Sequence, residues 1–208
     1  MSRPADIRAH ILECLPEIEW VSDEATREKI VDAFQMALER STWERLEDVP
    51  HVFAGKTPMG DMLGHVRQVV QLCRESVRIL NSFEHEIDEQ VVLVGALLHD
   101  VGKIVEYGLR EGVAVRNMRL RHPMLGAHMA LACGLPDDIV HIIMRHSAEG
   151  EIPLPPGHET GGGLANRRTI EGMVVANCDY LQAEARKRKW RAADGTDPPL
   201  DPGVPFNG

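Results

Sequence analysis

Apolar residues recur at spacings of three and four positions along most of the chain, which is the period of a helix with one buried face. The repeat predicts helices over residues 5–15, 23–47, 61–80, 123–133, 137–147 and 169–191. Residues 89–99 are apolar on nearly every side, so we predict that this segment is the central buried helix. Asp88 stands before it as an N-cap, and Gly102 stands after it as a stop signal.

Three segments depart from the helical repeat. Residues 55–60 contain two glycines and a proline, which predicts a loop. Two short alternating runs at 104–107 and 113–116 predict a small β-hairpin. Residues 150–167 are rich in glycine and proline and predict a long loop, of the kind that often borders a functional site.

These elements predict an all-α helical bundle with one small β-hairpin. We divide the chain into an N-terminal helical extension at 1–52, a main domain at 53–191 and a flexible tail at 192–208, which is rich in proline and glycine. The N-terminal helices either cover the core or form the contact of a homodimer. We expect loops 53–61 and 148–168 to shape any substrate pocket.

Composition narrows the class of protein. Hydrophobic residues make up 43% of the 208, so a substantial core can be buried. The formal net charge of −9 is a poor match for a nucleic-acid binder, which needs clustered basic residues. No long apolar run predicts a membrane span, and no secretory signal is visible. The four cysteines are far apart, which favours reduced thiols and a cytoplasmic location.

The sharpest chemical feature is the run Leu-Leu-His-Asp-Val-Gly-Lys at 97–103. It places His99 and Asp100 side by side at the end of the apolar helix. A carboxylate at a helix C-terminus opposes the helix dipole, which favours cations there, and a bound metal ion would remove that conflict. The alternative is a hydrogen-bonded pair within the core.

Other histidine and aspartate residues stand near helix ends or on inward helix faces. His65 lies on the mostly apolar face of the helix at 61–80, and Asp179 lies in an apolar stretch of the last helix. His122 precedes Pro123 at a helix start, and His146 ends the helix at 137–147. A carboxylate buried on an apolar face is costly unless it is paired or ligates a metal ion.

This ordered set resembles the ligand series of the HD superfamily of metal-dependent phosphohydrolases, over about residues 60–185. The resemblance implies an HD-domain helical bundle whose main domain, 53–191, holds two divalent transition-metal ions: iron or manganese, or else zinc, cobalt or nickel. It implies six metal ligands, namely His65, His99, Asp100, His122, His146 and Asp179. The histidines at 122 and 146 mark the dinuclear branch, in which Asp100 bridges the two ions.

The same resemblance implies a reaction. A hydroxide bridging the two ions attacks phosphorus, with Asp100 as the shared ligand and Lys103 reaching the anionic group of the substrate. The alternative for Lys103 is a solvated position at a helix end. Arg167 and Arg168, beside a run of three glycines, are further candidates for substrate contact.

A narrower resemblance covers residues 97–185, which are similar to the HD domain of bacterial 3′→5′ exoribonucleases. Those proteins carry an oligonucleotide-binding barrel ahead of the HD domain, whereas this chain has helices there. Together with the net charge of −9, this favours a small nucleotide-like phosphate ester over polymeric nucleic acid. No membrane partner is expected, because the chain has no long apolar run. The basic segment 186–191 is either a solvated helix end or a phosphate-binding rim on which Trp190 stacks a base.

Two other functions fit the same ligand types. One alternative for this chain is a mixed-valent di-iron oxygenase, a chemistry that some members of the superfamily carry out. The other is a non-catalytic metal-bound sensor or interaction domain. Six histidines are not expected to be metal ligands. We predict surface roles for four of them, His10, His51, His85 and His158. The other two, His128 and His141, lie near candidate ligands on the same helices but are out of phase with them.

Overall fold

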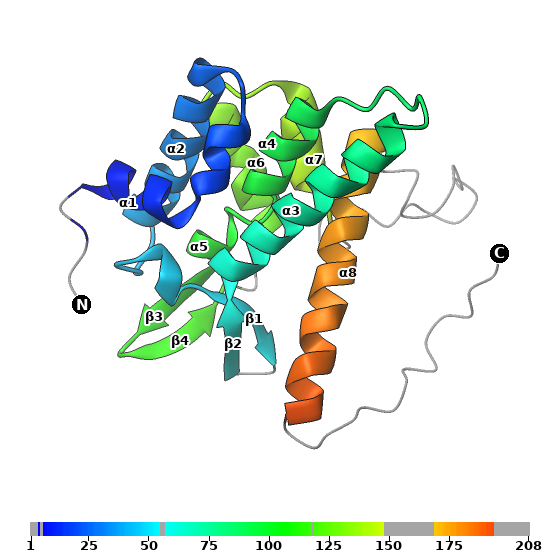
Figure 1. Cartoon of the computed structure of the whole chain (residues 1–208). Coiled ribbons are helices and arrows are strands. Elements are labelled where there is room, and N and C mark those ends of the chain that lie inside the picture. The colour runs from blue at the N-terminus through cyan, green and yellow to red at the C-terminus, as the bar shows by residue number, and fades with distance from the viewer. Residues whose placement is uncertain (1–3, 5, 55–56, 118, 148–168, 194–208) are drawn as a thin grey trace, which may run out of the picture.

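A computed structural model of the chain describes residues 4, 6–54, 57–117, 119–147 and 169–193 (Figure 1). Its helices are α1 (Ile7–Cys14), α2 (Glu24–Glu39), α3 (Met62–Asn81), α4 (Glu89–Leu98), α5 (Lys103–Glu106), α6 (His122–Ala132), α7 (Asp137–Arg145) and α8 (Ile170–Ala193). Two short 3₁₀ turns lie at Pro16–Trp20 and Leu46–Asp48. The strands form two antiparallel hairpins, β1 (Pro50–Ala54) with β2 (Thr57–Asp61) and β3 (Tyr107–Arg110) with β4 (Val113–Arg116). The all-α prediction is confirmed.

Aspartate side chains cap the starts of four helices by accepting hydrogen bonds from free backbone amides. Asp6 caps α1, Asp23 caps α2, and Asp88 caps α4 as predicted. Asp61 caps α3 by accepting from the amide of Gly64. This last cap sets the register of the turn that carries His65.

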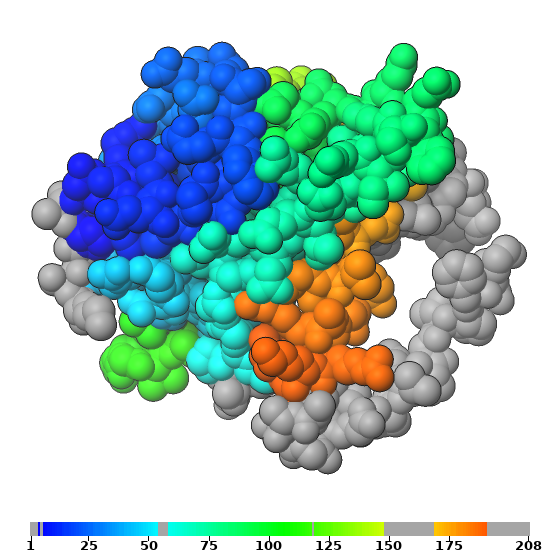
Figure 2. All heavy atoms as spheres, in the orientation of Figure 1, coloured from blue at the N-terminus to red at the C-terminus, as the bar shows by residue number. Residues whose placement is uncertain are grey.

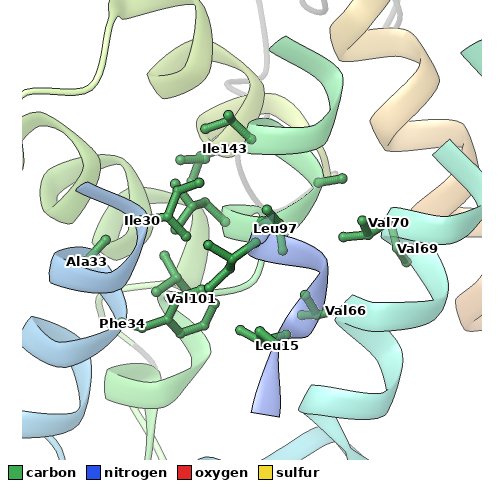
Figure 3. Packing of buried hydrophobic residues seen from close by; sticks show 14 of the residues in the cluster. Leu15, Ile30, Ala33, Phe34, Val66, Val69, Val70, Leu97, Val101 and Ile143 are labelled. Carbon is green, nitrogen blue, oxygen red and sulfur yellow. The ribbon is translucent and has the colours of Figure 1, made fainter. Parts of the chain in front are cut away.

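Helix α4 lies at the centre of the molecule, and every residue from Val92 to Leu98 is buried. Leu97 and Val101 pack against Ile30 and Phe34 of α2, while Val66 and its neighbours approach from α3 (Figure 3). The N-terminal helices therefore share one hydrophobic core with the rest of the bundle. In Figure 2 they form a continuous surface with α3. No helix of the described residues is long and apolar enough to cross a membrane.

One helix prediction is wrong at its C-terminal end. Helix α2 ends at Glu39, not near residue 47. Ser41 explains the stop, because its hydroxyl donates to the carbonyl of Leu38 and accepts from the amide of Trp43. A serine that bonds nearby backbone in this way competes with the helical hydrogen bonds.

The hairpin predictions also need correction. There are two hairpins in the described residues, not one, because strand 50–54 pairs with strand 57–61. The second of these strands occupies residues 57–60 of the segment predicted as a loop, so that part of the loop prediction is wrong. In the second hairpin, residues 104–106 belong to the short helix α5 and the strand begins at Tyr107. Residues 192 and 193 continue α8 instead of starting a tail. The predicted loop at 150–167 and the rest of the tail lie outside the described residues.

Candidate metal centre

The six candidate ligands converge from five parts of the chain. His65 is on α3, His99 and Asp100 follow the end of α4, and Asp179 is on α8. His122 begins α6 and His146 follows the end of α7. The four histidines and Asp100 are at most 3% exposed, and the Asp179 side chain is 16% exposed. The structure therefore brings all six predicted ligands into one buried cage.

Three of them form what we call the first cluster: His65, His99 and Asp179. The Nε2 atoms of His65 and His99 are 3.1 Å apart, and Asp179 Oδ1 lies 3.0 Å from His65 Nε2. Asp100 Oδ2 faces the same point, 3.4 Å from His65 Nε2 and 3.5 Å from His99 Nε2. These ligand atoms could hold a metal ion.

The second cluster consists of His122 and His146, whose Nε2 atoms are 3.2 Å apart. The other oxygen of Asp100, Oδ1, faces this pair at 3.4 Å and 3.6 Å. Asp100 therefore lies between the two clusters and turns one carboxylate oxygen toward each. The second cluster together with Asp100 could also hold a metal ion.

Two glycines, Gly102 and Gly126, allow this convergence. A Cβ at Gly102 would lie 2.1 Å from the carbonyl oxygen of His122, so only glycine lets the turn after α4 touch the start of α6. A Cβ at Gly126 would lie 2.9 Å from Ile143 Cγ2. The predicted role of Gly102 as a helix stop is therefore wrong, because α4 already ends at Leu98 and the glycine serves close packing.

The outer nitrogen of each ligand histidine faces an acceptor. His99 Nδ1 lies 2.7 Å from the carbonyl of Ala96, and His146 Nδ1 lies 2.7 Å from that of Ile143. His65 Nδ1 donates to Gln182 Oε1, whose orientation is set because Gln182 Nε2 donates to Gln68. His122 Nδ1 lies 3.0 Å from Glu106 Oε2.

These hydrogen-bond partners indicate which ring nitrogen of each ligand histidine carries the proton. With each Nδ1 as the donor, each neutral ring keeps its lone pair on Nε2. Two lone pairs then face each other in each cluster, together with carboxylate oxygens, and no proton satisfies them all. Such a set of inward acceptors requires cations. Imidazole and carboxylate ligands suit divalent iron, manganese or zinc, so the residues present fit the metal ions expected from the sequence.

Glu106 supports the second cluster and was missed by sequence reasoning. Its side chain is fully buried and accepts from Arg116 Nε at 2.6 Å and Arg121 Nε at 2.9 Å. It also accepts from the backbone amide and the ring of His122. The sequence placed it in a strand, and only its proximity to His122 in space reveals the role.

Burial and neighbouring charges shift the pKa values in the cage. Burial lowers the pKa of His99 to about 4, despite the carboxylates of Asp100 and Asp179. Burial alone would raise the pKa of Asp100, but the Lys103 ammonium and nearby histidines hold it well below its usual range. Burial opposes the charge of Lys103, yet the Asp100 carboxylate raises its pKa overall. The neutral imidazoles and charged carboxylates are the forms that bind metal.

Lys103 lies inside the cage and not at a solvated helix end. It is 6% exposed, and its Nζ donates to Asp100 Oδ2 at 2.7 Å. Arg167 and Arg168, the other candidates for substrate contact, lie outside the described residues. In the basic segment, Arg186 donates to the carbonyl and carboxylate of Asp61, and Trp190 packs on Gly60.

Two of the histidines expected at the surface are buried. His10 is 6% exposed and lies 3.0 Å from Glu47, while His51 is 2% exposed and stacks on His65. Both predictions are wrong, because tertiary contacts bury polar-looking segments. His85 is exposed as expected, and His158 lies outside the described residues. His128 is exposed and His141 is half-buried, and neither belongs to the two clusters.

The family model for the HD domain matches residues 62–184. The chain belongs to the HD-domain family. Metal-dependent phosphohydrolase chemistry and binding of divalent metal ions are general properties of HD domains, and the predicted family is confirmed. The matched segment contains every one of the six candidate ligands.

Three curated proteins are similar to parts of this chain. A ribonuclease Y of Acidothermus cellulolyticus is 40% identical over 98 residues, which cover 47% of this chain and 15% of that protein. A tRNA (cytidine(56)-2′-O)-methyltransferase of Thermoplasma volcanium is 27% identical over 135 residues, covering 62% of this chain and 33% of the relative. An uncharacterised protein of Methanocaldococcus jannaschii is 25% identical over 128 residues, covering 58% and 66% respectively. The alignments thus span less than two thirds of each relative, and no solved structure matches the chain.

Proposed function

We propose that this HD domain is a phosphohydrolase or phosphodiesterase that acts on a small, nucleotide-like phosphate ester through a dinuclear metal centre. The observation that carries the proposal is the position of Asp100, whose two oxygens face different histidine pairs at 3.4–3.6 Å. A carboxylate so placed is the natural bridge between two ions. The first cluster with Asp100 would hold one ion, and the second cluster with Asp100 the other.

Two ions held this way supply an activated water nucleophile and positive charge for the phosphoryl oxygens. The side chains of the protein contribute the orientation of the ligands and a further positive charge. The Nδ1 partners orient the four imidazoles, and burial of the cage strengthens its electrostatic interactions. The ammonium of Lys103, beside Asp100 Oδ2, adds a positive charge where the anionic substrate would bind.

The substrate class follows from charge and from the relatives. A chain of net charge −9 is poorly suited to a long polyanion, which favours a small phosphate ester over polymeric nucleic acid. The similarity to a ribonuclease Y supports a phosphodiester or nucleotide-like group. Iron and manganese are the proposed ions, and a homodimer and a cytoplasmic location remain parts of the proposal.

The test combines metal content with turnover. Protein purified without oxygen is reconstituted with Mn²⁺, Fe²⁺ or Co²⁺, and bound metal is counted by mass spectrometry. Phosphate or alcohol release is then measured on a panel of nucleotides and on bis(p-nitrophenyl) phosphate. We expect two ions per chain and hydrolysis that disappears in Asp100→Asn. Fully metallated protein that hydrolyses nothing on the panel would refute the proposal, and substrate-dependent oxygen uptake by the iron form would indicate an oxygenase instead.

A further inference from the structure

His51 on β1 is a buried histidine beside the cage that belongs to neither cluster. It is 2% exposed, although its strand lies at the edge of the bundle. Its ring stacks on that of His65, with centroids 3.9 Å apart and planes inclined by 26°. A strand outside the helical core therefore delivers an imidazole directly onto a candidate metal ligand.

Contacts with the end of α8 hold the hairpin in this position. Arg186 donates to the Asp61 carbonyl at 2.7 Å and to its carboxylate at 2.9 Å. Trp190 packs so closely on Gly60 that a Cβ there would lie 2.5 Å from the indole ring. The same indole is 6.2 Å from the His51 ring, between centroids. Figures 1 and 2 show the lower end of α8 beside β1 and β2. Contacts between the β1–β2 hairpin and the C-terminal end of α8 therefore hold His51 in position.

The hydrogen-bonding capacity of His51 is unused within the described part of the chain. Its Nδ1 is buried and has no hydrogen-bond partner among those residues. A ring nitrogen of His51, one of His65 and an oxygen of Asp100 all lie within 4.8 Å of one another. A polar ring at this distance from the proposed bridging carboxylate can reach whatever binds there.

The stacking geometry argues against His51 as a seventh metal ligand. A ligated ion lies in the plane of the imidazole, along the nitrogen lone pair, at about 2.1 Å. Two rings stacked with nearly parallel planes cannot both direct a lone pair at the same ion. Because His65 already faces the first cluster through Nε2, the ring of His51 is placed to contact a group bound beside the cage and not an ion within it.

We propose that His51 contacts the substrate, donating a hydrogen bond from its ring to an oxygen of the phosphoryl group of a phosphate monoester or diester. This inference rests on the proposed function. Lys103 supplies charge for that group from the side of Asp100, and His51 supplies a directed donor from the hairpin. A neutral imidazole does this without adding another positive charge to a site that holds Lys103 and two ions.

Two variants separate hydrogen bonding from stacking in the full-length, Mn²⁺-loaded protein. His51→Phe keeps a flat ring on His65 but removes the donor, and His51→Asn keeps a donor without the aromatic ring. We expect both to retain metal content and unfolding temperature. In His51→Phe the Kd of inorganic phosphate, measured by calorimetry, should rise about tenfold or more, with a similar fall in kcat/KM on bis(p-nitrophenyl) phosphate. His51→Asn should recover part of both losses.

His10→Phe is the matched control, because His10 is also buried but contacts Cys14 and Glu47 away from the cage. It should leave the Kd of phosphate unchanged. A wild-type Kd in His51→Phe, loss of metal in that variant, or no phosphate binding by the wild type would each overturn the inference. If the wild type hydrolyses the ester and His51→Phe does so equally well, the inference about His51 is wrong and the proposed function stands. If His51→Phe weakens phosphate binding but the wild type hydrolyses no substrate, the proposed function is wrong and the contact between His51 and phosphate stands.

Discussion

The two halves of the cage use the same ring nitrogens but differ in charge and support. The first cluster has its own carboxylate, Asp179, and its histidines are backed by neutral acceptors, Gln182 and a backbone carbonyl. The second cluster has two histidines and no carboxylate of its own, yet one of its rings is backed by the buried carboxylate of Glu106. The first cluster therefore carries a negative charge on one of its ligands, whereas the second carries it on a residue that hydrogen-bonds one of its ligands.

For the proposed dinuclear centre, the difference predicts that the two ions bind with unequal affinity. A ligating carboxylate acts on the ion directly, whereas an outer carboxylate acts by making the imidazole a better donor. We therefore expect the first cluster to bind its ion more tightly. The second ion should depend on Asp100 and on Glu106.

Removing the shared ligand should have the largest effect, because it affects both halves. We expect Asp100→Asn to lower hydrolysis by more than about 1000-fold and to reduce bound metal, measured by mass spectrometry. The variant also leaves the buried Lys103 without its carboxylate, which should cost about 3–5 kcal/mol of stability in chemical unfolding.

A double variant separates these two effects. Asp100→Asn combined with Lys103→Met should regain stability but not activity. If Asp100→Asn alone kept two ions per chain, the bridging role of Asp100 would be wrong.

Variants in the separate halves should differ in how much metal they retain. His146→Ala removes a ligand from the weaker site, so we expect one ion per chain after desalting. Asp179→Ala removes the carboxylate of the stronger site, so we expect less than one. Both should lose about 100-fold in hydrolysis. Retention of more metal by Asp179→Ala than by His146→Ala would reverse the proposed order of affinities.

Outer residues should have smaller effects that again differ between the halves. We expect Glu106→Gln to weaken the second ion by about 10–100-fold, because His122 loses an anionic partner. Gln182→Leu should weaken the first ion less, since its acceptor is neutral. Stepwise Mn²⁺ titration measures both constants. Equal losses in the two variants would show that the charge of the outer partner does not matter.

The smallest expected effect is the pH dependence of the metal-free protein. The folded-state pKa of His99 is about 4, against 6.5 for the unconstrained group. Between these values the unfolded state binds more protons, so stability should fall as pH drops from about 6.5 toward 4 and stay level above 7. The contribution of His99 to this loss between pH 7 and pH 6 should be under about 1 kcal/mol. Chemical unfolding with chelator measures it, and greater stability at pH 6 would contradict the assignment.

Local signals in the sequence predicted all the long helices, and the resemblance to the HD superfamily implied the six candidate ligands. Helix starts follow from residues such as Asp88, and Gly102 stands in the run 97–103 beside His99 and Asp100. The predicted role of Gly102 as a helix stop was wrong, but its position in the run 97–103 still marked the segment that carries His99 and Asp100. The family's ordered residues then place the ligands in one site.

The β1–β2 hairpin was missed because its stability comes from distant contacts. Its strands contain Pro50, Pro58 and Gly60, which disfavour a strand locally. Their partner Arg186 is 125 positions from Asp61, so no local pattern could reveal the contact. His51 and Glu106 were missed for the same reason: each gains its role from a side chain that only folding brings near.

Helix α8 closes the cage by supplying both Asp179 and Gln182, and Gln182 lies 117 positions after its partner His65. A chain still emerging from the ribosome therefore lacks the first cluster until its last helix has been made. The second cluster and Asp100 all precede α8, so the chain completes that half of the cage first. A stop codon anywhere before α8 would remove Asp179 and Gln182 and leave the first cluster incomplete.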